Sequence, residues 1–280
     1  MPDGGRLVVC ATPIGNLGDV TLRVLEALRT ADTIAAEDTR VTSKLLARYE
    51  ITGRLERCDE HTVERRTPRL LERIAAGEVI ALCSDAGTPG VSDPGARLVD
   101  ACLEAGLTVE VLPGASAILA ALVASGLPTH AFYFGGFLPR KAGERLRALE
   151  ALAALDATLV FYESPNRAGA VLTSIAQAYP GRRAVLAREL TKMHEEVVRG
   201  PIEQVAQEIS SREVIRGEVV LLVGPPVAVE RPPTDVAAVR ARVEELVSAG
   251  ENRSRAVKHV ASELGLPRSE VYDIAHRPPE

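Results

Sequence analysis

Apolar runs of strand length alternate with segments of helical periodicity through the first half of this chain. The expected strands cover residues 7–12, 33–36, 79–83 and 107–112, and the expected helices cover about 21–30, 42–49, 68–76, 96–105 and 117–125. Such alternation is typical of βαβ units, whose strands run parallel. The sequence therefore predicts an α/β fold whose first domain, residues 1–126, is a mostly parallel sheet with helices on both faces.

A second α/β segment follows the turn-rich break at residues 126–130. Its expected strands cover residues 131–135, 158–162, 183–187, 195–199 and 218–223, and its helices lie near 142–154, 167–178 and 202–209. Several connections are short enough for antiparallel pairing, so the sheet of this second domain, residues 127–225, is expected to be mixed.

A Pro-rich run, residues 224–233, is expected to form an extended linker to a third part of the chain. Residues 235–280 have the apolar spacing of three short helices and predict a small helical module. Within it, residues 261–272 resemble a helix-turn-helix with Gly265 at the turn.

Composition restricts the class of protein. No apolar stretch approaches the roughly 20 residues that a membrane span needs, and the first residues lack the pattern of a signal peptide, so we expect a cytoplasmic protein without membrane contact. Cys10, Cys58, Cys83 and Cys102 form no CxxC pair and are expected to be buried thiols. A net charge of -5 argues against coating of nucleic acid by bulk electrostatics, so such contacts would need local basic patches.

The loop at residues 84–95 is the strongest functional signal. It follows an apolar run and combines three glycines and two prolines with acidic and hydroxyl side chains, as loops that approach a ligand do. Three more loops, at residues 13–19, 37–40 and 113–116, follow other strands of the same sheet. Because ligands of open α/β sheets bind at the carboxyl ends of strands, we expect the four loops to converge on one cleft. The alternative is that Gly and Pro merely shape the turns.

Neither common nucleotide-binding motif is present. The first loop lacks GxGxxG, and the chain contains no GxxxxGK[ST], so a dinucleotide fold and a P-loop lose their main support. A nucleotide-like cofactor that is held in another way remains possible.

Acids and a histidine in the first domain are candidates for proton transfer. Glu37 and Asp38 are adjacent at a strand end, and neighbouring carboxylates can shift each other's pKa. The alternative is that Asp38 caps a helix and pairs with Arg40. His61 could be a base or an ordinary solvated loop residue.

Two turns of the second domain carry further polar residues. These are Glu163, Asn166, Arg167, Arg188, Glu189 and Lys192, which would meet at one sheet edge if both strands point the same way. Internal ion pairs such as Arg167 with Glu189 are the structural alternative.

Basic clusters also occur at residues 65–73, 140–147 and 253–258. Solvated helix faces explain each of them singly. Between residues 235 and 277 seven acidic residues balance seven basic ones, so charge does not identify the helix-turn-helix as a DNA-binding element.

Eight motifs, in order along the chain, carry a family resemblance. They are residues 11–19 (ATPIGNLGD), 36–40 (AEDTR), 84–89 (SDAGTP), 92–95 (SDPG), 113–116 (PGAS), 136–140 (GFLPR), 161–165 (FYESP) and 187–192 (ARELTK). Together they resemble the ribosomal RNA small subunit methyltransferase I family of the tetrapyrrole methylase superfamily. The resemblance extends over about residues 6–224.

The resemblance implies a two-domain methyltransferase, usually a homodimer, with S-adenosyl-L-methionine folded in the cleft between its domains. It implies 2′-O-methylation of a cytidine ribose in the decoding region of 16S rRNA in the small ribosomal subunit. By motif, the cofactor is expected to meet Pro13, Asp85, Ala86, Gly87, Thr88, Val91, Ser116, Ala117, Tyr162 and Leu190. A metal is not required, because a sulfonium is already a strong methyl electrophile.

A ribose hydroxyl needs a general base, for which the candidates are Glu37, Asp38, His61 and Glu189. Candidate RNA contacts are Arg40, Arg140, Lys141, Arg167 and Lys192. The C-terminal helices are expected to bind RNA or ribosomal protein by shape. At residues 57–62 the chain departs from the aromatic-His-Glu-His-Asn pattern usual in the family and keeps only Glu60 and His61.

Two other functions stay open at this point. One is a C-methyltransferase acting on a tetrapyrrole, which the basic clusters and the helical module disfavour. The other is a ligand-sensing regulator that binds DNA through the helix-turn-helix, which the neutral charge of the module disfavours.

Overall fold

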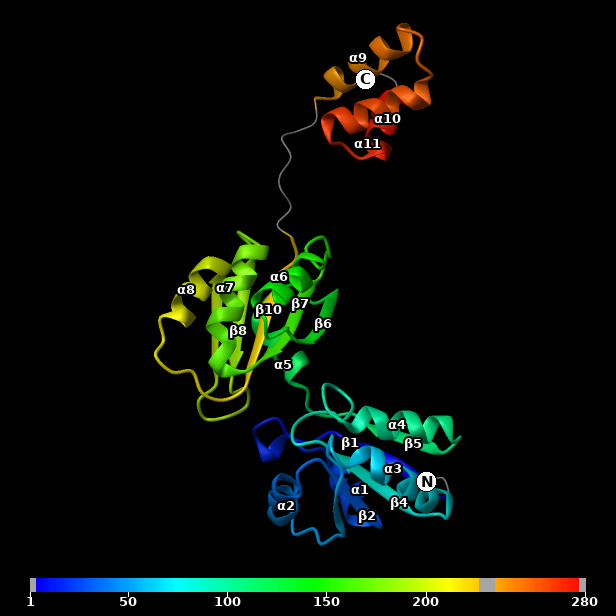
Figure 1. Cartoon of the computed structure of the whole chain (residues 1–280), viewed down its shortest axis with the longest axis vertical. Helices are drawn as coiled ribbons and strands as arrows, with labels where there is room; N and C mark the ends of the chain where they lie inside the picture. Colours follow the sequence, from blue (N-terminus) through cyan, green and yellow to red (C-terminus); the bar gives the residue numbers. More distant parts are fainter. Residues whose placement is uncertain (1–3, 227–234, 277–280) are drawn as a thin grey trace. The chain divides into compact units, whose positions relative to one another are not determined.

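The computed structural model describes residues 4–226 and 235–276, and these described residues belong to two compact units, one from each of the two ranges. The first unit contains two five-stranded sheets with their helices, and the second contains three helices (Figure 1). Each unit is described separately below.

The first sheet is entirely parallel. Its strands are β1 (Arg6–Cys10), β2 (Thr33–Ala36), β3 (Leu55–Arg57), β4 (Val79–Cys83) and β5 (Thr108–Leu112), in the order β3-β2-β4-β1-β5. All five carboxyl ends therefore lie along one edge, where the four loops begin or end.

Helices cover both faces of this sheet, as predicted. They are α1 (Leu22–Thr30), α2 (Thr39–Arg48), α3 (Val63–Ala75) and α4 (Gly95–Glu104). Val8 and Cys10 of β1 pack into one apolar cluster with α1 and α2, whereas Leu7 and Val9 pack into another with α3 and α4. This alternation follows from the period of two residues in a strand.

The second sheet is mixed, as predicted. Its strands are β6 (Phe132–Phe137), β7 (Thr158–Glu163), β8 (Arg183–Arg188), β9 (Glu196–Pro201) and β10 (Val219–Val223), in the order β6-β7-β10-β8-β9. Only the β6–β7 pair is parallel. Because β10 runs antiparallel to both β7 and β8, these two strands point the same way.

One face of the second sheet packs against α6 (Ala142–Glu150), α7 (Ala168–Ala178) and α8 (Ile202–Ser210). Its other face packs against α5 (Ala117–Ser125), whose apolar cluster also includes Ile14 from the first domain and Leu190. One apolar cluster thus joins the two halves of this unit, the first α/β domain and the second.

Two expectations about the first domain were incomplete. The short strand β3 has no strong apolar run and was missed. Helix α3 begins at Val63 rather than near Pro68, because Val63, Leu70 and Ile74 form one buried helical stripe that continues through the proline. The four cysteines are buried free thiols, as expected.

The second unit consists of α9 (Val236–Ser248), α10 (Arg253–Leu264) and α11 (Arg268–His276) around an apolar core of their own. Gly265 ends α10 in the left-handed conformation, at a φ of 63°, and starts the turn into α11. Most of the expected linker, residues 227–233, lies outside the described residues. In the part of the chain that is described, no helix is long and apolar enough to span a membrane.

Candidate functional site

Three of the four loops of the first sheet are joined by hydrogen bonds. Thr12 and Gly87 form a two-way backbone bridge, with N–H···O distances of 2.8 and 3.0 Å. The Thr12 hydroxyl also donates to the carbonyl oxygen of Ser84 at 3.1 Å. Thr88 Oγ1 donates to the Ala115 carbonyl at 3.4 Å, which connects the loop at 84–95 to the loop at 113–116.

The remaining loop, at 37–40, is attached by a reciprocal pair of hydrogen bonds. The Asp85 backbone N–H donates to Glu37 Oε2 at 3.2 Å, and the Asp38 N–H donates to Asp85 Oδ1 at 2.9 Å. The four loops therefore converge at one sheet edge, and the turn residues shape the loops while their polar groups hold them together.

The acids of this edge differ in proton affinity. Burial raises the pKa of the Glu37 carboxyl and of the Asp85 carboxyl above their ordinary values. Asp38, in contrast, receives hydrogen bonds from the Arg40 side chain and backbone, which lower its pKa to about 2. Asp38 also caps α2, so it has the helix-capping role that the sequence left open.

A strained loop of the second sheet, residues 189–192, lies at the end of β8. Glu189 and Thr191 have positive φ angles of 52° and 66°, which non-glycine residues rarely adopt. Lys192 Nζ lies 2.8 Å from Glu189 Oε1 and 3.2 Å from Glu218 Oε2. The hydrogen bond from Lys192 lowers the pKa of the Glu189 carboxyl.

Internal ion pairs, the structural alternative for these residues, do form, but with partners other than the Arg167–Glu189 example. Arg167 instead lies 3.2 Å from Glu163 and donates to the Leu138 carbonyl at 2.8 Å. The strand β10 separates β7 from β8, so each acid pairs with a cation close to it in sequence.

The two halves of the unit meet at Gly15. A Cβ atom at this position would lie 2.5 Å from Lys192 Cγ and 2.8 Å from both the Leu190 carbonyl oxygen and Thr191 Oγ1. Only glycine therefore allows the first loop to approach the 189–192 loop this closely.

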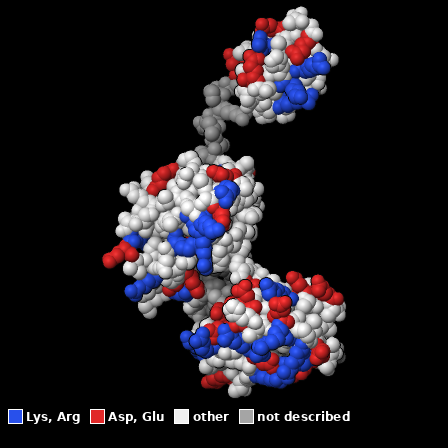
Figure 2. All heavy atoms as spheres, in the orientation of Figure 1, with Lys and Arg blue, Asp and Glu red and all other residues white. Residues whose placement is uncertain are grey.

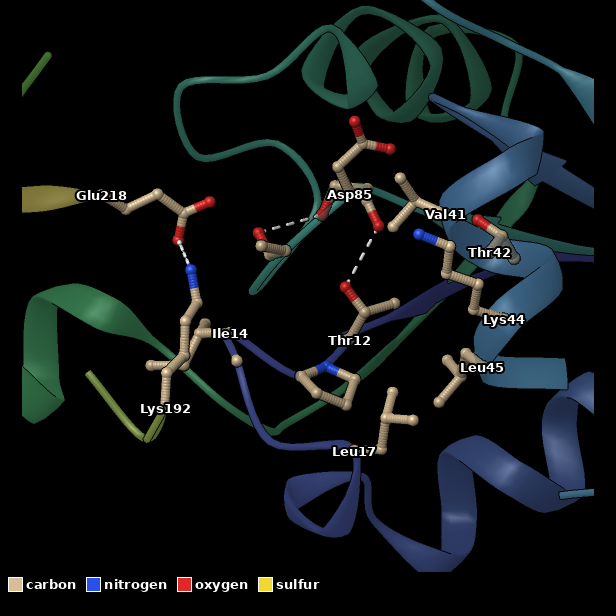
Figure 3. A pocket seen from close by; sticks show the side chains of 14 residues that line it. Thr12, Ile14, Leu17, Val41, Thr42, Lys44, Leu45, Asp85, Lys192 and Glu218 are labelled. Atoms are coloured by element: carbon tan, nitrogen blue, oxygen red, sulfur yellow. Dashed lines mark hydrogen bonds and ion pairs between the residues drawn. The ribbon is translucent and has the colours of Figure 1, made fainter. Parts of the chain in front are cut away.

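A pocket of about 400 Å³ opens beside this contact (Figure 3). Its lining comes from the first loop, from α2, from the start of the 84–95 loop and from the second sheet. The residues are Thr12, Pro13, Ile14, Gly15, Leu17, Val41, Thr42, Lys44, Leu45, Ser84, Asp85, Ala86, Lys192 and Glu218. Four of the predicted site residues, Pro13, Asp85, Ala86 and Lys192, line it.

Three of the other predicted cofactor residues belong to or pack against the apolar cluster that joins the two α/β domains. Leu190 is buried in this cluster, and Ala117 and Tyr162 pack against it. Ser116 caps α5 by accepting from the Leu119 N–H at 3.4 Å. Burial raises the pKa of the Tyr162 hydroxyl, and the charges of Glu218 and Asp93 add to this effect.

This region is chemically suited to a sulfonium cofactor with an adenosine group. It offers apolar surface, the backbone N–H groups at the start of α5, and a loop whose Gly87 and Gly90 have positive φ angles of 80° and 94°. Gly87, Thr88 and Val91 belong to that loop, and Val91 is 40% exposed.

His61 and most of the predicted RNA contacts lie outside the pocket. His61 is exposed between β3 and α3, and Arg140 is exposed between β6 and α6. Lys141 pairs with Glu144 at 3.1 Å, and Arg40 pairs with Asp38. Figure 2 shows Lys and Arg side chains on the visible face of the first unit, mixed with acids. Their roles stay predictions.

Sequence reasoning missed the contribution of α2 and of the short helix η1 (Leu17–Asp19). The signal was present, because α2 begins within the loop at 37–40 and its first turns must rise from the same sheet edge. Thr42 and Leu45, three residues apart, share one face of that helix.

Comparison with known proteins defines the class. The family model described as tetrapyrrole (corrin/porphyrin) methylases matches residues 6–206. A solved structure of uroporphyrin-III C-methyltransferase from Thermus thermophilus, complexed with S-adenosyl homocysteine, has a TM-score of 0.55 at 22% identity and covers 78% of this chain and 97% of its own. The fold is therefore that of these methyltransferases.

Curated relatives define the family more narrowly. A protein of Halalkalibacterium halodurans is 42% identical over 98% of this chain and 96% of its own length, and one of Mesorhizobium japonicum is 48% identical over 82% and 79%. Both are named ribosomal RNA small subunit methyltransferase I. The chain belongs to the tetrapyrrole methylase family and, within it, to the ribosomal RNA small subunit methyltransferase I family. It is a methyltransferase, as its motifs predicted.

Proposed function

We propose that this protein methylates the 2′-oxygen of a cytidine ribose in the decoding region of 16S rRNA, with S-adenosyl-L-methionine as the methyl donor. The observation that carries the proposal is the full-length similarity, at 42% identity, to a protein named for rRNA methylation. We place the reaction in the cytoplasm, on the small ribosomal subunit.

The proposed cofactor site consists of Pro13, the 84–95 loop, the start of α5, Tyr162 and Leu190. The methyltransferase from Thermus thermophilus, which shares the fold, is complexed with S-adenosyl homocysteine, the product of such a donor. When bound, S-adenosylmethionine supplies an activated methyl group that is transferred to the ribose oxygen. The protein must align that oxygen and receive its proton.

We rank Glu37 first among the four candidates for the proton acceptor; it does not itself line the pocket, but it accepts a hydrogen bond from the backbone of Asp85, which does. Its raised pKa makes it a stronger base than an ordinary carboxylate, whereas Asp38 and Glu189 have lowered pKa values and cationic partners. Asp85 acts as a positioning residue, because its backbone N–H donates to Glu37. His61 is exposed on the connection between β3 and α3 and ranks behind Glu37.

Arg40, Arg140, Lys141, Arg167 and Lys192 are proposed to hold RNA phosphates around the site. Arg167 and Lys192 already form ion pairs, as Arg40 and Lys141 do. An RNA phosphate would therefore compete with a carboxylate for each of these four side chains. The α9–α11 module is proposed to add binding energy for the ribosomal substrate by shape, since RNA helices are recognised largely through their shape.

A homodimer is proposed as well, and exposed apolar side chains support it. Leu119 and Val123 of α5 are 53% and 77% exposed, and Phe132 and Phe137 of the edge strand β6 are 44% and 57% exposed. Apolar side chains of this size are a common feature of subunit interfaces. Sedimentation of the purified protein at several concentrations checks this proposal.

The function is tested by incubating the protein with labelled S-adenosylmethionine and one of three substrates: unmethylated small subunits, naked rRNA or a tetrapyrrole precursor. We expect label in rRNA, on a ribose of the decoding region. Transfer only to the tetrapyrrole, or tight binding of duplex DNA without any transfer, would contradict the proposal.

A further inference from the structure

The pocket of Figure 3 is lined by apolar side chains that are partly open to solvent. Leu17 and Val41 line it and are 39% and 38% exposed, although they come from different elements, η1 and α2. Leu45, one turn after Val41, is buried beneath them. Flat apolar groups such as nucleobases bind between side chains of this kind.

The pocket wall also contains a hydroxyl without a partner. Thr42 is 2% exposed, and its Oγ1 has no hydrogen-bond partner within the described part of the chain. A buried, unpaired hydroxyl costs free energy, which a bound polar group can recover. Threonine in a helix populates two χ1 rotamers, so this hydroxyl can turn toward a ligand.

The two lysines of the pocket differ in their pairing. Lys192 is engaged by Glu189 and Glu218. Lys44, on α2, is exposed and has no ion-pair partner among residues 4–226 and 235–276. Lys44 is therefore the cation of this pocket that is available to an anionic ligand.

The pocket is adjacent to the proposed cofactor site but distinct from it. Pro13, Asp85 and Ala86 belong to both, whereas Val91, Ser116 and Tyr162 do not line the pocket. Methyl transfer requires the acceptor oxygen next to the donor methyl. A pocket that shares one wall with the donor site is where the acceptor belongs.

We propose that this pocket receives the target nucleotide itself, turned out of its stack. The base lies between Leu17 and Val41, the Thr42 hydroxyl bonds with it, and Lys44 contacts a flanking phosphate. This inference rests on the proposed function and extends it to the residues that hold the acceptor. The volume of about 400 Å³ is near the low end for ligand pockets, which suits one nucleotide. Recognition of single-stranded RNA commonly uses bases that are splayed out in this way.

The first test uses Thr42→Val, which keeps the shape and removes the hydroxyl. We expect the KM for unmethylated small subunits to rise about fivefold to tenfold while the Kd for S-adenosyl homocysteine stays unchanged. The free protein becomes more resistant to urea, because an unpaired buried hydroxyl is gone. Thr30→Val is the matched control, since the Thr30 hydroxyl donates to the Glu26 carbonyl at the exposed end of α1.

The second test uses Lys44→Gln, with Arg48→Gln, one turn along the same helix and outside the pocket lining, as control. We expect Lys44→Gln to reduce the slope of log KM against log salt by about 1, as the loss of one phosphate contact does, and Arg48→Gln to change it less.

The outcomes separate the inference from the function on which it rests. A wild-type protein that labels no RNA contradicts both. A wild-type protein that labels the rRNA ribose, together with a Thr42→Val variant that keeps its RNA KM or loses cofactor affinity, overturns the pocket assignment alone. Equal salt slopes for the two helix variants overturn the phosphate contact.

Discussion

Two acids at the carboxyl edge of the first sheet, Glu37 and Asp85, differ in proton affinity from Glu189 at the end of a strand of the second sheet. Glu37 and Asp85 accept hydrogen bonds from neutral backbone N–H groups, and burial raises their pKa values. Glu189 is bound by the ammonium group of Lys192, which lowers its pKa. Burial disfavours the charged form of a carboxyl and so leaves it able to take up a proton, whereas a bound cation favours the charged form.

On this basis we assign different roles to the two α/β domains. In our proposal the first domain provides the proton acceptor, and the second provides a wall in which Lys192 pairs with Glu189 and Glu218. Gly15 brings the two together.

The comparison predicts its largest effect for Glu37→Gln. The amide keeps an acceptor for the Asp85 N–H but cannot take up a proton, so kcat falls about 100-fold to 10,000-fold. Initial rates with saturating cofactor measure this change, and calorimetry with S-adenosyl homocysteine is expected to give an unchanged Kd. If Glu189→Gln lowers kcat as much as Glu37→Gln does, the assignment of the proton acceptor to the first domain is wrong.

The second-largest effect is expected for Gly15→Ala, whose kcat/KM should fall about 100-fold. The added methyl group would push the Leu190–Lys192 segment away from the first loop, and small misplacements of reacting groups have large kinetic costs. Gly143→Ala, at an open position in α6, serves as control and retains activity. A fully active Gly15→Ala variant would show that this close approach is dispensable.

The pH dependence of kcat sharpens the choice of base. Glu37 must be deprotonated to act, so the rate falls as pH decreases through its raised pKa, above the ordinary glutamate value. A Glu189 base would place this fall below that value, because its pKa is lowered. A pH–rate profile between about pH 4 and 9 separates the two.

The smallest effect concerns stability. Glu189→Gln removes the pair with Lys192 and is expected to lower the free energy of unfolding by up to about 1 kcal/mol at neutral pH. Because the folded-state pKa of Glu189 is lowered, this contribution is present above its unfolded pKa and is lost as pH falls through the folded one. Urea titrations of both proteins at pH 7 and pH 3 check it, and a difference that persists at pH 3 would contradict the ion-pair explanation.

Local sequence patterns were sufficient to predict most strands and helices and the convergence of the four loops. Apolar periodicity marks the strands, and parallel topology puts their ends at one edge. The partner of Arg167 could not be derived from the sequence, because it depends on β10 lying between β7 and β8, and no local pattern specifies that strand order. The role of Thr42 was missed because an unpaired hydroxyl becomes visible only in the packed structure.

The most direct test measures 2′-O-methylcytidine in decoding-region RNA after incubation of unmethylated small subunits with the wild-type protein or Glu37→Gln. Nuclease digestion and mass spectrometry quantify the product over time. We predict one methylated cytidine for the wild type and formation at least about 100-fold slower for the variant. Methylation at another atom, or equal rates for both proteins, would contradict the assignment of reaction and base.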